Sequence, residues 1–151
     1  MTNWTFSEES ISAVAGEIAA KLASHRQGFV LHLVGTLGAG KTTLTRAILR
    51  ALGLPEDEVV LSPTFTYFNE YEINGRWYAH VDLYRAREGM RLEDIGLADA
   101  RPYHGLFIEW PDQLGKQPLI NPTHIIHIEM VERDANLRMA MLSQLVEESG
   151  R

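Results

Sequence analysis

The stretch Gly35-Thr36-Leu37-Gly38-Ala39-Gly40-Lys41-Thr42 decides the fold of this chain of 151 residues. It satisfies the pattern G-x-x-x-x-G-K-[ST], in which glycines let the backbone turn until several N–H groups point at the phosphates of a nucleotide. The N-terminus of a following helix adds partial positive charge. Lys41 would supply a mobile cation for the β- and γ-phosphates, and the Thr42 hydroxyl is a hard oxygen ligand for Mg²⁺.

The residues on both sides of this loop support that interpretation. Residues 29–34 form an apolar run rich in β-forming residues, and a helix with an apolar face follows the loop and ends at Gly53 and Pro55. Strand, glycine-rich loop and helix in this order predict a domain that binds a nucleoside triphosphate with Mg²⁺. The residues expected to bind the phosphates are Gly38, Ala39, Gly40, Lys41, Thr42 and Thr43.

Hydrophobic patterns predict further strands and helices along the rest of the chain. Asn74-Gly75 joins two runs of aromatic and β-branched residues. This is a strong hairpin signal, because a type I′ turn needs positive φ at both central positions. The expected elements are a helix over 7–24, hairpin strands over 64–73 and 76–83, a weak helix over 88–100, and strands over 106–108, 123–131 and 136–142. A C-terminal helix running to Glu148 is the alternative for the last segment.

Together these elements predict one α/β domain that spans residues 1–151. We expect a three-layer, P-loop NTPase-like arrangement with helices on both faces of a mixed central sheet. The predicted hairpin would form an antiparallel portion of that sheet, and the helices are long enough to cover a portion that is parallel.

The composition excludes several classes of protein. Apolar residues make up 45% of the chain and charged residues 23%, which is close to the globular average and rules out a disordered or fibrous chain. The absence of cysteine excludes a disulfide scaffold, a thiolate zinc site and cysteine catalysis. The apolar runs are too short for a membrane span, and the polar, acidic N-terminus is unlike a signal peptide. A net charge of −6 argues against direct binding of naked nucleic acid. We therefore expect a cytoplasmic protein.

Two carboxylates are candidates for the second group that a phosphate loop needs beside its magnesium ion. Asp82 lies in the return strand of the hairpin, and Glu109 follows the apolar run 106–108. Ligands of α/β domains bind at the C-terminal edge of a parallel sheet, so Glu109 is well placed to face the phosphates, directly or through a metal-bound water. Asp82 would be its partner or would orient the attacking water. The alternative for each is a strand-end carboxylate in a surface ion pair.

Ser62-Pro63-Thr64 occupies the position where nucleoside triphosphatases place a switch segment, between the helix of the loop and the hairpin. Thr64 would add a hydroxyl or carbonyl oxygen to the cluster of γ-phosphate and magnesium, and its release on hydrolysis would loosen the segment. On physical grounds alone, the same three residues are equally a turn before a strand.

Three further features are a tryptophan, a histidine and a group of arginines. Trp110 would either stack on a partner or close an edge of the core. His80 is expected to be hydrogen-bonded within the sheet, because the histidines show no metal-ligand spacing. Arginines are concentrated in the middle of the chain and would form either a surface for a partner or tRNA, or an ordinary solvated face. They are Arg76, Arg85, Arg87, Arg91 and Arg101. Arg85, if it lies near Asp82, would reach a phosphate or orient the acid.

Four motifs follow one another along the chain. They are Gly38-Ala39-Gly40-Lys41-Thr42-Thr43, Ser62-Pro63-Thr64-Phe65-Thr66, His80-Val81-Asp82-Leu83-Tyr84-Arg85 and Ile108-Glu109-Trp110-Pro111. In this order and at this spacing they resemble the TsaE (YjeE-type) family of bacterial P-loop ATPases. The phosphate loop alone is widespread, whereas the combination of the four motifs is specific. The resemblance extends over nearly the whole chain, from about residue 9 to residue 141.

The resemblance implies a part in making threonylcarbamoyladenosine, the modification beside the anticodon in tRNAs that read codons beginning with A. In that family the ATPase joins the TsaB and TsaD proteins, TsaD performs the transfer to tRNA, and ATP hydrolysis supports turnover of the complex. It therefore implies ATP and Mg²⁺ as cofactors and TsaB-like and TsaD-like proteins as partners, with tRNA involved only indirectly. We expect a monomer with weak ATPase activity when alone.

The family motifs also imply individual roles. Thr42 and Glu109 become the Mg²⁺ ligands, Asp82 a catalytic or water-positioning acid, Thr64 a switch residue, and Trp110 a functional aromatic residue beside the site.

The family places the start of its first helix near the adenine, which points here to the segment from Glu9 to Ser12. Two segments depart from the family pattern. Residues 86–92 carry two arginines where many relatives read Leu-Ala-Asp-Pro-Glu-Glu-Leu, and residues 132–138 are hard to align.

Other functions of a phosphate loop make different demands on the sequence. A GTPase needs a guanine reader of the Asn-Lys-x-Asp kind, and none of the three lysines follows an asparagine, so adenine should be preferred. A small-molecule or nucleoside kinase needs an acceptor pocket and an arginine-bearing lid, for which residues 88–101 are the candidate. A third possibility is that ATP only holds a complex together and is not hydrolysed.

Overall fold

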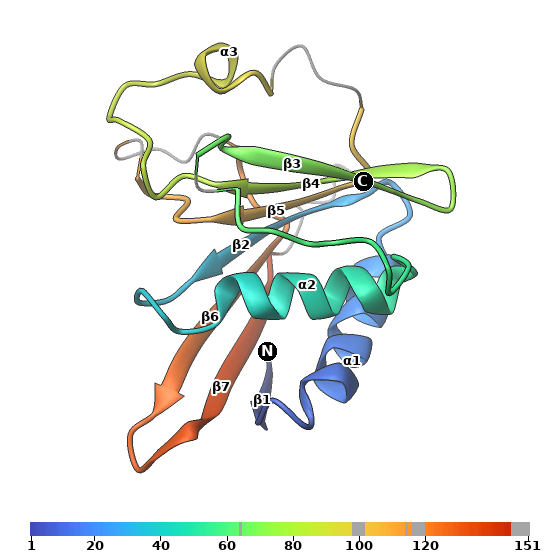
Figure 1. Ribbon diagram of the computed structural model, residues 1–151, viewed down its shortest axis with the longest axis vertical. Coiled ribbons are helices and arrows are strands. Elements are labelled where there is room, and N and C mark those ends of the chain that lie inside the picture. Colours follow the sequence, from blue (N-terminus) through green and yellow to red (C-terminus); the bar gives the residue numbers. More distant parts are fainter. Residues whose placement is uncertain (64, 98–101, 114, 116–119, 146–151) are drawn as a thin grey trace.

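The computed structural model describes residues 1–63, 65–97, 102–113, 115 and 120–145 (Figure 1). Its elements, in chain order, are β1 (Thr2–Phe6), α1 (Ile11–Ala23), β2 (Phe29–Val34), α2 (Lys41–Leu52), β3 (Phe68–Ile73), β4 (Arg76–Asp82), α3 (Leu92–Ile95), β5 (Gly105–Glu109), β6 (His124–Val131) and β7 (Asp134–Gln144). Within the described residues, all seven strands join one sheet in the order β1-β7-β6-β2-β5-β4-β3. In these same ranges no helix is long and apolar enough to cross a bilayer.

The sheet is mixed, as the sequence predicts. Strands β4, β5, β2 and β6 are neighbours and run parallel, whereas β3, β7 and β1 are antiparallel to their neighbours. Parallel strands end at the same edge of a sheet, and in this chain β2, β4 and β5 do so. Glu109 at the end of β5 is in register with Leu33 of β2 on one side and with Asp82 of β4 on the other. The end of β2, where the phosphate loop begins, therefore lies beside both predicted carboxylates.

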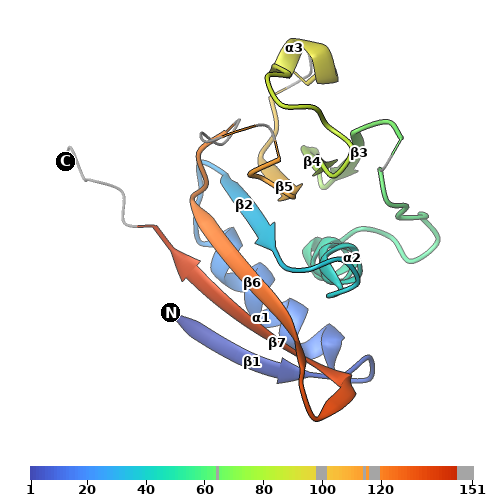
Figure 2. The same cartoon turned by 90° about the vertical axis from the view of Figure 1, so that its left-hand side faces the viewer.

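The two faces of the sheet are covered unequally (Figures 1 and 2). Helices α1 and α2 pack against each other and against one face, where their apolar sides form the larger core with inward-facing residues of the strands. A smaller core lies over the other face of β4 and β5, under the chain from β4 to α3. The predicted layers are present, but the second helical layer consists of the four-residue α3 alone among the described residues.

Local signals account for the hairpin and for the shortness of α3. Asn74 and Gly75 have φ of 50° and 80°, which is the positive-φ pair that a type I′ turn requires between β3 and β4. The helix predicted over 88–100 is helical only at Leu92–Ile95 in its described part, and residues 98–100 lie outside the described residues. Gly89 and Gly96 have φ of 88° and 93°, which is incompatible with a right-handed helix.

Three features at the ends of the chain differ from the prediction. β1 was not expected, because its short, polar sequence carries no strong pattern, and it is ordered by pairing with β7. The predicted helix over 7–24 starts only at Ile11, since a turn spans Ser7 to Ser10. The last strand is real and longer than predicted, so the alternative helix is excluded over residues 134–144.

The buried histidine of β6 gives a test of the fold. Burial, with a smaller effect from His25, lowers the pKa of His124 to about 4. In the unfolded chain the value is about 6.5, so between these values the unfolded state binds more protons. The stabilisation is complete above pH 6.5 and is lost as the pH falls through 4. In urea unfolding at pH 7 and pH 4, the loss of stability at pH 4 should be smaller in His124→Gln than in the wild type by up to about 2 kcal/mol.

The exposed His127 of the same strand provides the control for this experiment. His127→Gln should retain the full pH dependence of the wild-type chain. An identical pH dependence in wild type and His124→Gln would contradict the buried, neutral state of His124.

Candidate functional site

The phosphate loop leaves the end of β2 and enters α2 through glycines that its geometry requires. Gly38 and Gly40 have φ of 82° and 106°, and Gly40 is the N-cap of α2. A Cβ on Gly35 would lie 2.6 Å from the carbonyl oxygen of Ile128 in β6, so only glycine fits where the loop passes that strand. The loop thus presents the start of α2, with its unpaired backbone N–H groups, at the sheet edge.

Lys41 is held at the centre of this loop. Its side chain is only 5% exposed, and Nζ donates to the carbonyl oxygens of Gly35 and Thr36 at 2.8 and 3.0 Å. The same Nζ lies 4.2 Å from the ring centroid of Trp110. Burial lowers the pKa of Lys41, while the charges of Glu109 and Asp82 act in the opposite direction. The ammonium group of Lys41 therefore lies beside the carboxylates of Glu109 and Asp82 in a poorly solvated environment.

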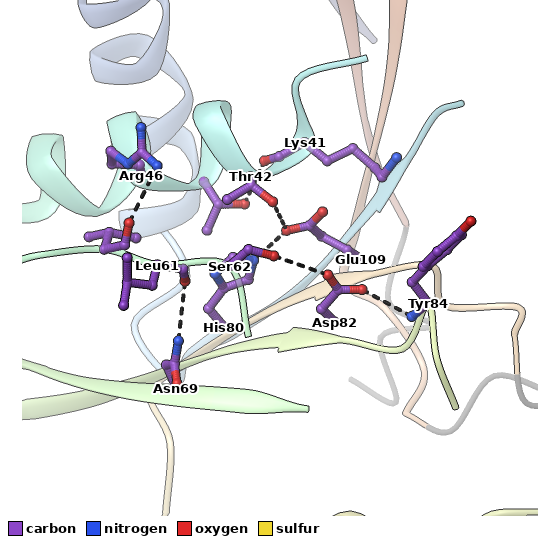
Figure 3. A network of polar contacts seen from close by, with 12 residues as sticks. Lys41, Thr42, Arg46, Leu61, Ser62, Asn69, His80, Asp82, Tyr84 and Glu109 are labelled. Atoms are coloured by element: carbon purple, nitrogen blue, oxygen red, sulfur yellow. Dashed lines mark hydrogen bonds and ion pairs between the residues drawn. The ribbon is translucent and has the colours of Figure 1, made fainter. Parts of the chain in front are cut away.

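Glu109 is bonded from two directions by residues distant in the sequence (Figure 3). Its Oε2 accepts a hydrogen bond from Thr42 Oγ1 at 2.8 Å and another from Nε2 of His80. Both Glu109 and His80 are buried. The two residues predicted to hold a magnesium ion, Thr42 and Glu109, are thus in direct contact, and His80 is hydrogen-bonded to a side chain of the site.

Asp82 lies beside this group and is oriented by two other hydrogen bonds (Figure 3). Oδ1 accepts from the backbone N–H of Tyr84 at 3.0 Å, and Oδ2 accepts from the hydroxyl of Ser62 at 3.4 Å. Burial raises the pKa of Asp82 above its usual range, although the Tyr84 N–H opposes this. Ser62 of the predicted switch segment therefore contacts the predicted acid, whereas Thr64 lies outside the described residues.

These groups line a cleft of about 390 Å³. Its wall consists of Leu37, Gly38, Gly40, Lys41, Thr42, Thr43, Ser62, Asp82, Tyr84, Glu109 and Trp110. In the described part of the chain, no three His, Cys, Asp or Glu side chains form a cluster that could hold a metal alone. The donor set fits Mg²⁺, because that ion is usually bound by one or two carboxylates together with a hydroxyl, water and the phosphates of a substrate.

A second cleft of about 630 Å³ lies on the other side of the phosphate loop, where it meets the start of α1. Glu9, expected near the adenine, and Thr43, expected near the phosphates, both line it, whereas Ser12 does not and is exposed on α1. The opposite wall is the segment 134–138. Arg138 fixes this wall to the loop, since its Nε donates to the carbonyl oxygen of Ala39 at 3.0 Å.

In the sequence analysis, residues 132–138 were hard to align with the family and the segment 134–138 was assigned no part in the site, and no local signal marks it. It is polar and carries no motif, and it reaches the loop only because β6 and β7 extend past the sheet edge as a hairpin. Ala39 itself is fully buried and enters the larger core.

Trp110 and Arg85 lie near the cleft or beside it in the chain, in different settings. Trp110 has a φ of 58°, a strained value for a non-glycine residue, and its ring lies 5.0 Å from that of Tyr84. Trp110 lines the cleft and also packs on the smaller core. Arg85 lies over the ring of Phe65 at 4.3 Å, and no ion pair with Asp82 occurs in the described residues. Arg101 lies outside the described residues.

A phosphate loop between a parallel strand and a helix, with a carboxylate of the next strand bonded to the loop threonine, defines a P-loop-type α/β domain. Residues 5–140 match the family model described as threonylcarbamoyl adenosine biosynthesis protein TsaE. The chain therefore belongs to the TsaE family, whose role lies in tRNA threonylcarbamoyladenosine biosynthesis.

Individual relatives agree with this assignment. The chain is 34% identical over 130 residues to the tRNA threonylcarbamoyladenosine biosynthesis protein TsaE of Haemophilus influenzae, covering 85% of this chain and 80% of that protein. It is 36% identical over 116 residues to the TsaE protein of Bacillus subtilis, covering 75% and 68%. Among solved structures, YdiB of Bacillus subtilis superposes with a TM-score of 0.65 at 27% identity, over 95% of this chain and 84% of that one.

The buried charge of Asp82 leads to a prediction about stability. Because its folded-state pKa is raised, the folded state binds more protons than the unfolded state as the pH rises from about 4, and stability is lost as the pH rises through the folded pKa. Asp82→Asn should therefore be at least as stable as the wild type at pH 7, within the roughly 0.5–2 kcal/mol of a typical stabilising substitution. Urea unfolding at pH 7 measures this difference.

Asp57 is exposed and serves as the matched control. Asp57→Asn should change the unfolding free energy by less than about 0.5 kcal/mol. A clear destabilisation of Asp82→Asn at pH 7 would show that Asp82 contributes to the fold and is not held there at a cost in stability.

Proposed function

We propose that this chain binds ATP with Mg²⁺ and hydrolyses it, and that it thereby supports turnover of a TsaB–TsaD-type transferase complex in the synthesis of threonylcarbamoyladenosine on tRNA. The observation that carries the proposal is the hydrogen bond from the Thr42 hydroxyl to Glu109, 2.8 Å long and beside the buried ammonium group of Lys41. In P-loop nucleoside triphosphatases, a loop threonine or serine and a strand carboxylate hold the magnesium ion together.

Each group then has a defined part in phosphoryl transfer. Thr42 and Glu109 would hold Mg²⁺, which neutralises charge on the phosphates as the bond to the γ-phosphate breaks. Lys41 and the N–H groups at the start of α2 would bind the phosphate oxygens. The desolvated setting of Lys41 strengthens its interaction with an anion, because charges attract more strongly where water is scarce.

Asp82 is the candidate for positioning the attacking water. It lines the same cleft as Glu109 and is held by hydrogen bonds from Tyr84 and Ser62. Burial raises its pKa, and a raised carboxylate pKa favours acceptance of a proton from a reacting group at neutral pH. The link through Ser62 would also let the segment that contains Thr64 respond to loss of the γ-phosphate.

The nucleoside fits the second cleft, between the start of α1 and the segment 134–138. This cleft adjoins the loop at Ala39, Gly40 and Thr43, so a nucleotide bound to the loop has space for its base there. Adenine is the expected base, because the sequence carries no Asn-Lys-x-Asp guanine reader.

Family membership supports the assignment of TsaB-like and TsaD-like partners. On this proposal the chain is a cytoplasmic monomer that meets tRNA only through the complex. Nucleoside triphosphatases of this kind are often slow alone, because a partner orders the switch or supplies a stabilising group worth roughly a thousandfold or more in rate. We therefore propose weak ATPase activity in the isolated chain and a higher rate with partners.

The loop lysine gives the first test. Lys41→Ala should remove most ATP affinity, by about tenfold or more, because the desolvated cation is lost while the fold retains its core. Lys21→Ala, at an exposed position on α1, is the control and should bind as the wild type does. Titration with a fluorescent ATP analogue measures both constants, and equal affinity in the two variants would refute the assignment of the phosphate loop.

The destination of the γ-phosphate gives the second test. ATP labelled at the γ-phosphate is incubated with the chain alone, and with a TsaB–TsaD pair and tRNA. Free labelled phosphate should appear slowly in the first case and at least tenfold faster in the second. Label in an added small molecule would instead establish the kinase alternative, and release that never responds to the partners would refute their part in the proposal.

A further inference from the structure

His80 is a fully buried histidine whose hydrogen bonding is unusual. It lies in β4 with an exposed fraction of 0%, and its side chain is on the face of the sheet that carries α2 and the phosphate loop. Nε2 contacts Glu109, and Nδ1 has no partner among the described residues. Buried polar atoms are nearly always hydrogen-bonded, so an apolar residue would suit this position better unless the contact with Glu109 has a use.

The two carboxylate oxygens of Glu109 differ in their hydrogen bonding. A carboxylate only accepts hydrogen bonds, so Nε2 of His80 is the donor. Oε2 takes both this bond and the bond from Thr42, whereas Oε1 accepts none from the described residues. In Figure 3 this second oxygen points away from His80. Two donors on one oxygen fix the rotation of the carboxylate and leave the other oxygen for a ligand.

The donor, His80, lies in a part of the backbone that is held on both sides by neighbouring strands. β4 lies between β3 and β5, so His80 is in the interior of the sheet, in register with Asn69 and Phe107. Glu109 is one residue beyond Ile108 at the end of β5, where the chain leaves the sheet at Trp110 with a φ of 58°. The hydrogen bonds from His80 and Thr42 to Oε2 restrict the rotation of the Glu109 side chain at this strand end.

We propose that His80 is a positioning residue for the magnesium site: its Nε2–H holds Glu109 so that one carboxylate oxygen binds the Thr42 hydroxyl and the other is presented to the metal. This inference rests on the proposed function, because it concerns how the chain holds Mg²⁺ with ATP. The residues that orient ligating carboxylates typically change metal affinity by roughly 10–100-fold when they are replaced.

The test measures how strongly Mg²⁺ tightens the binding of a fluorescent ATP analogue. The dissociation constant of the analogue is determined over a series of Mg²⁺ concentrations for the wild type, His80→Leu and His80→Gln. Leucine fills the space without a donor, whereas the glutamine amide can place an N–H near the position of Nε2. His80→Leu should need about tenfold more Mg²⁺ or more for the same tightening, and His80→Gln should stay within about threefold of the wild type.

His32 provides the structural control. It is also buried, lies in β2, and bonds through Nε2 to the carbonyl oxygen of Ile120 and not to the cleft. His32→Leu should keep the wild-type response to Mg²⁺. If His80→Leu does not fold, His80→Asn replaces it, because its shorter amide cannot reach Glu109 as glutamine does. Melting curves establish that each variant used is folded.

The outcomes separate this inference from the function on which it rests. If Mg²⁺ does not tighten nucleotide binding in the wild type, the proposed function fails and the role of His80 fails with it. If the wild type responds to Mg²⁺ but His80→Leu responds equally, only the role of His80 is refuted. Equal impairment of the leucine (or asparagine) and glutamine variants would likewise refute it, because the effect would then follow the loss of histidine and not the loss of the donor.

Discussion

The carboxylate of Glu109 joins three parts of the chain that are remote in sequence. It stands at the end of β5, accepts a hydrogen bond from Thr42 in the first turn of α2, and accepts another from His80 in β4. This contact is possible because β4, β5 and β2 run parallel and end at one edge, so that the helix entered from β2 begins opposite the end of β5. The position of the phosphate loop relative to the acids depends on this arrangement.

The same arrangement concentrates charge where solvation is poor. Lys41, Asp82 and Glu109 are all buried around one cleft. Burial lowers the pKa of Lys41 and raises that of Asp82, so in both cases it works against the charged form. A ligand that combines phosphates with a divalent cation brings both signs of charge into the cleft. On the proposed function, it would neutralise the lysine and the acids together and so offset the cost of burying them.

How much of the fold could be predicted depends on the range of the interactions that form each element. The strand before the loop, α2 and the β3–β4 turn follow from local patterns, because an apolar run, a glycine-lysine-threonine sequence and Asn74-Gly75 each restrict the backbone directly. β1 has no such pattern and exists because β7 offers it a partner. The helix expected over 88–100 was overestimated, because two glycines with positive φ outweigh its apolar spacing.

The candidate site divides in the same way. By itself, the sequence determined the candidate groups: a loop of the phosphate-binding pattern, a lysine and a threonine at its end, and two acids at the ends of strands, since these are properties of residue type and spacing. Only the tertiary structure decided which acid bonds to Thr42, that His80 lies behind it, that Arg85 lies over Phe65, and that the segment 134–138 faces the loop. The hydrogen bonds among these contacts join residues that are 29 to 99 positions apart in the sequence. They depend on strand order and register, which periodicity along one segment does not specify.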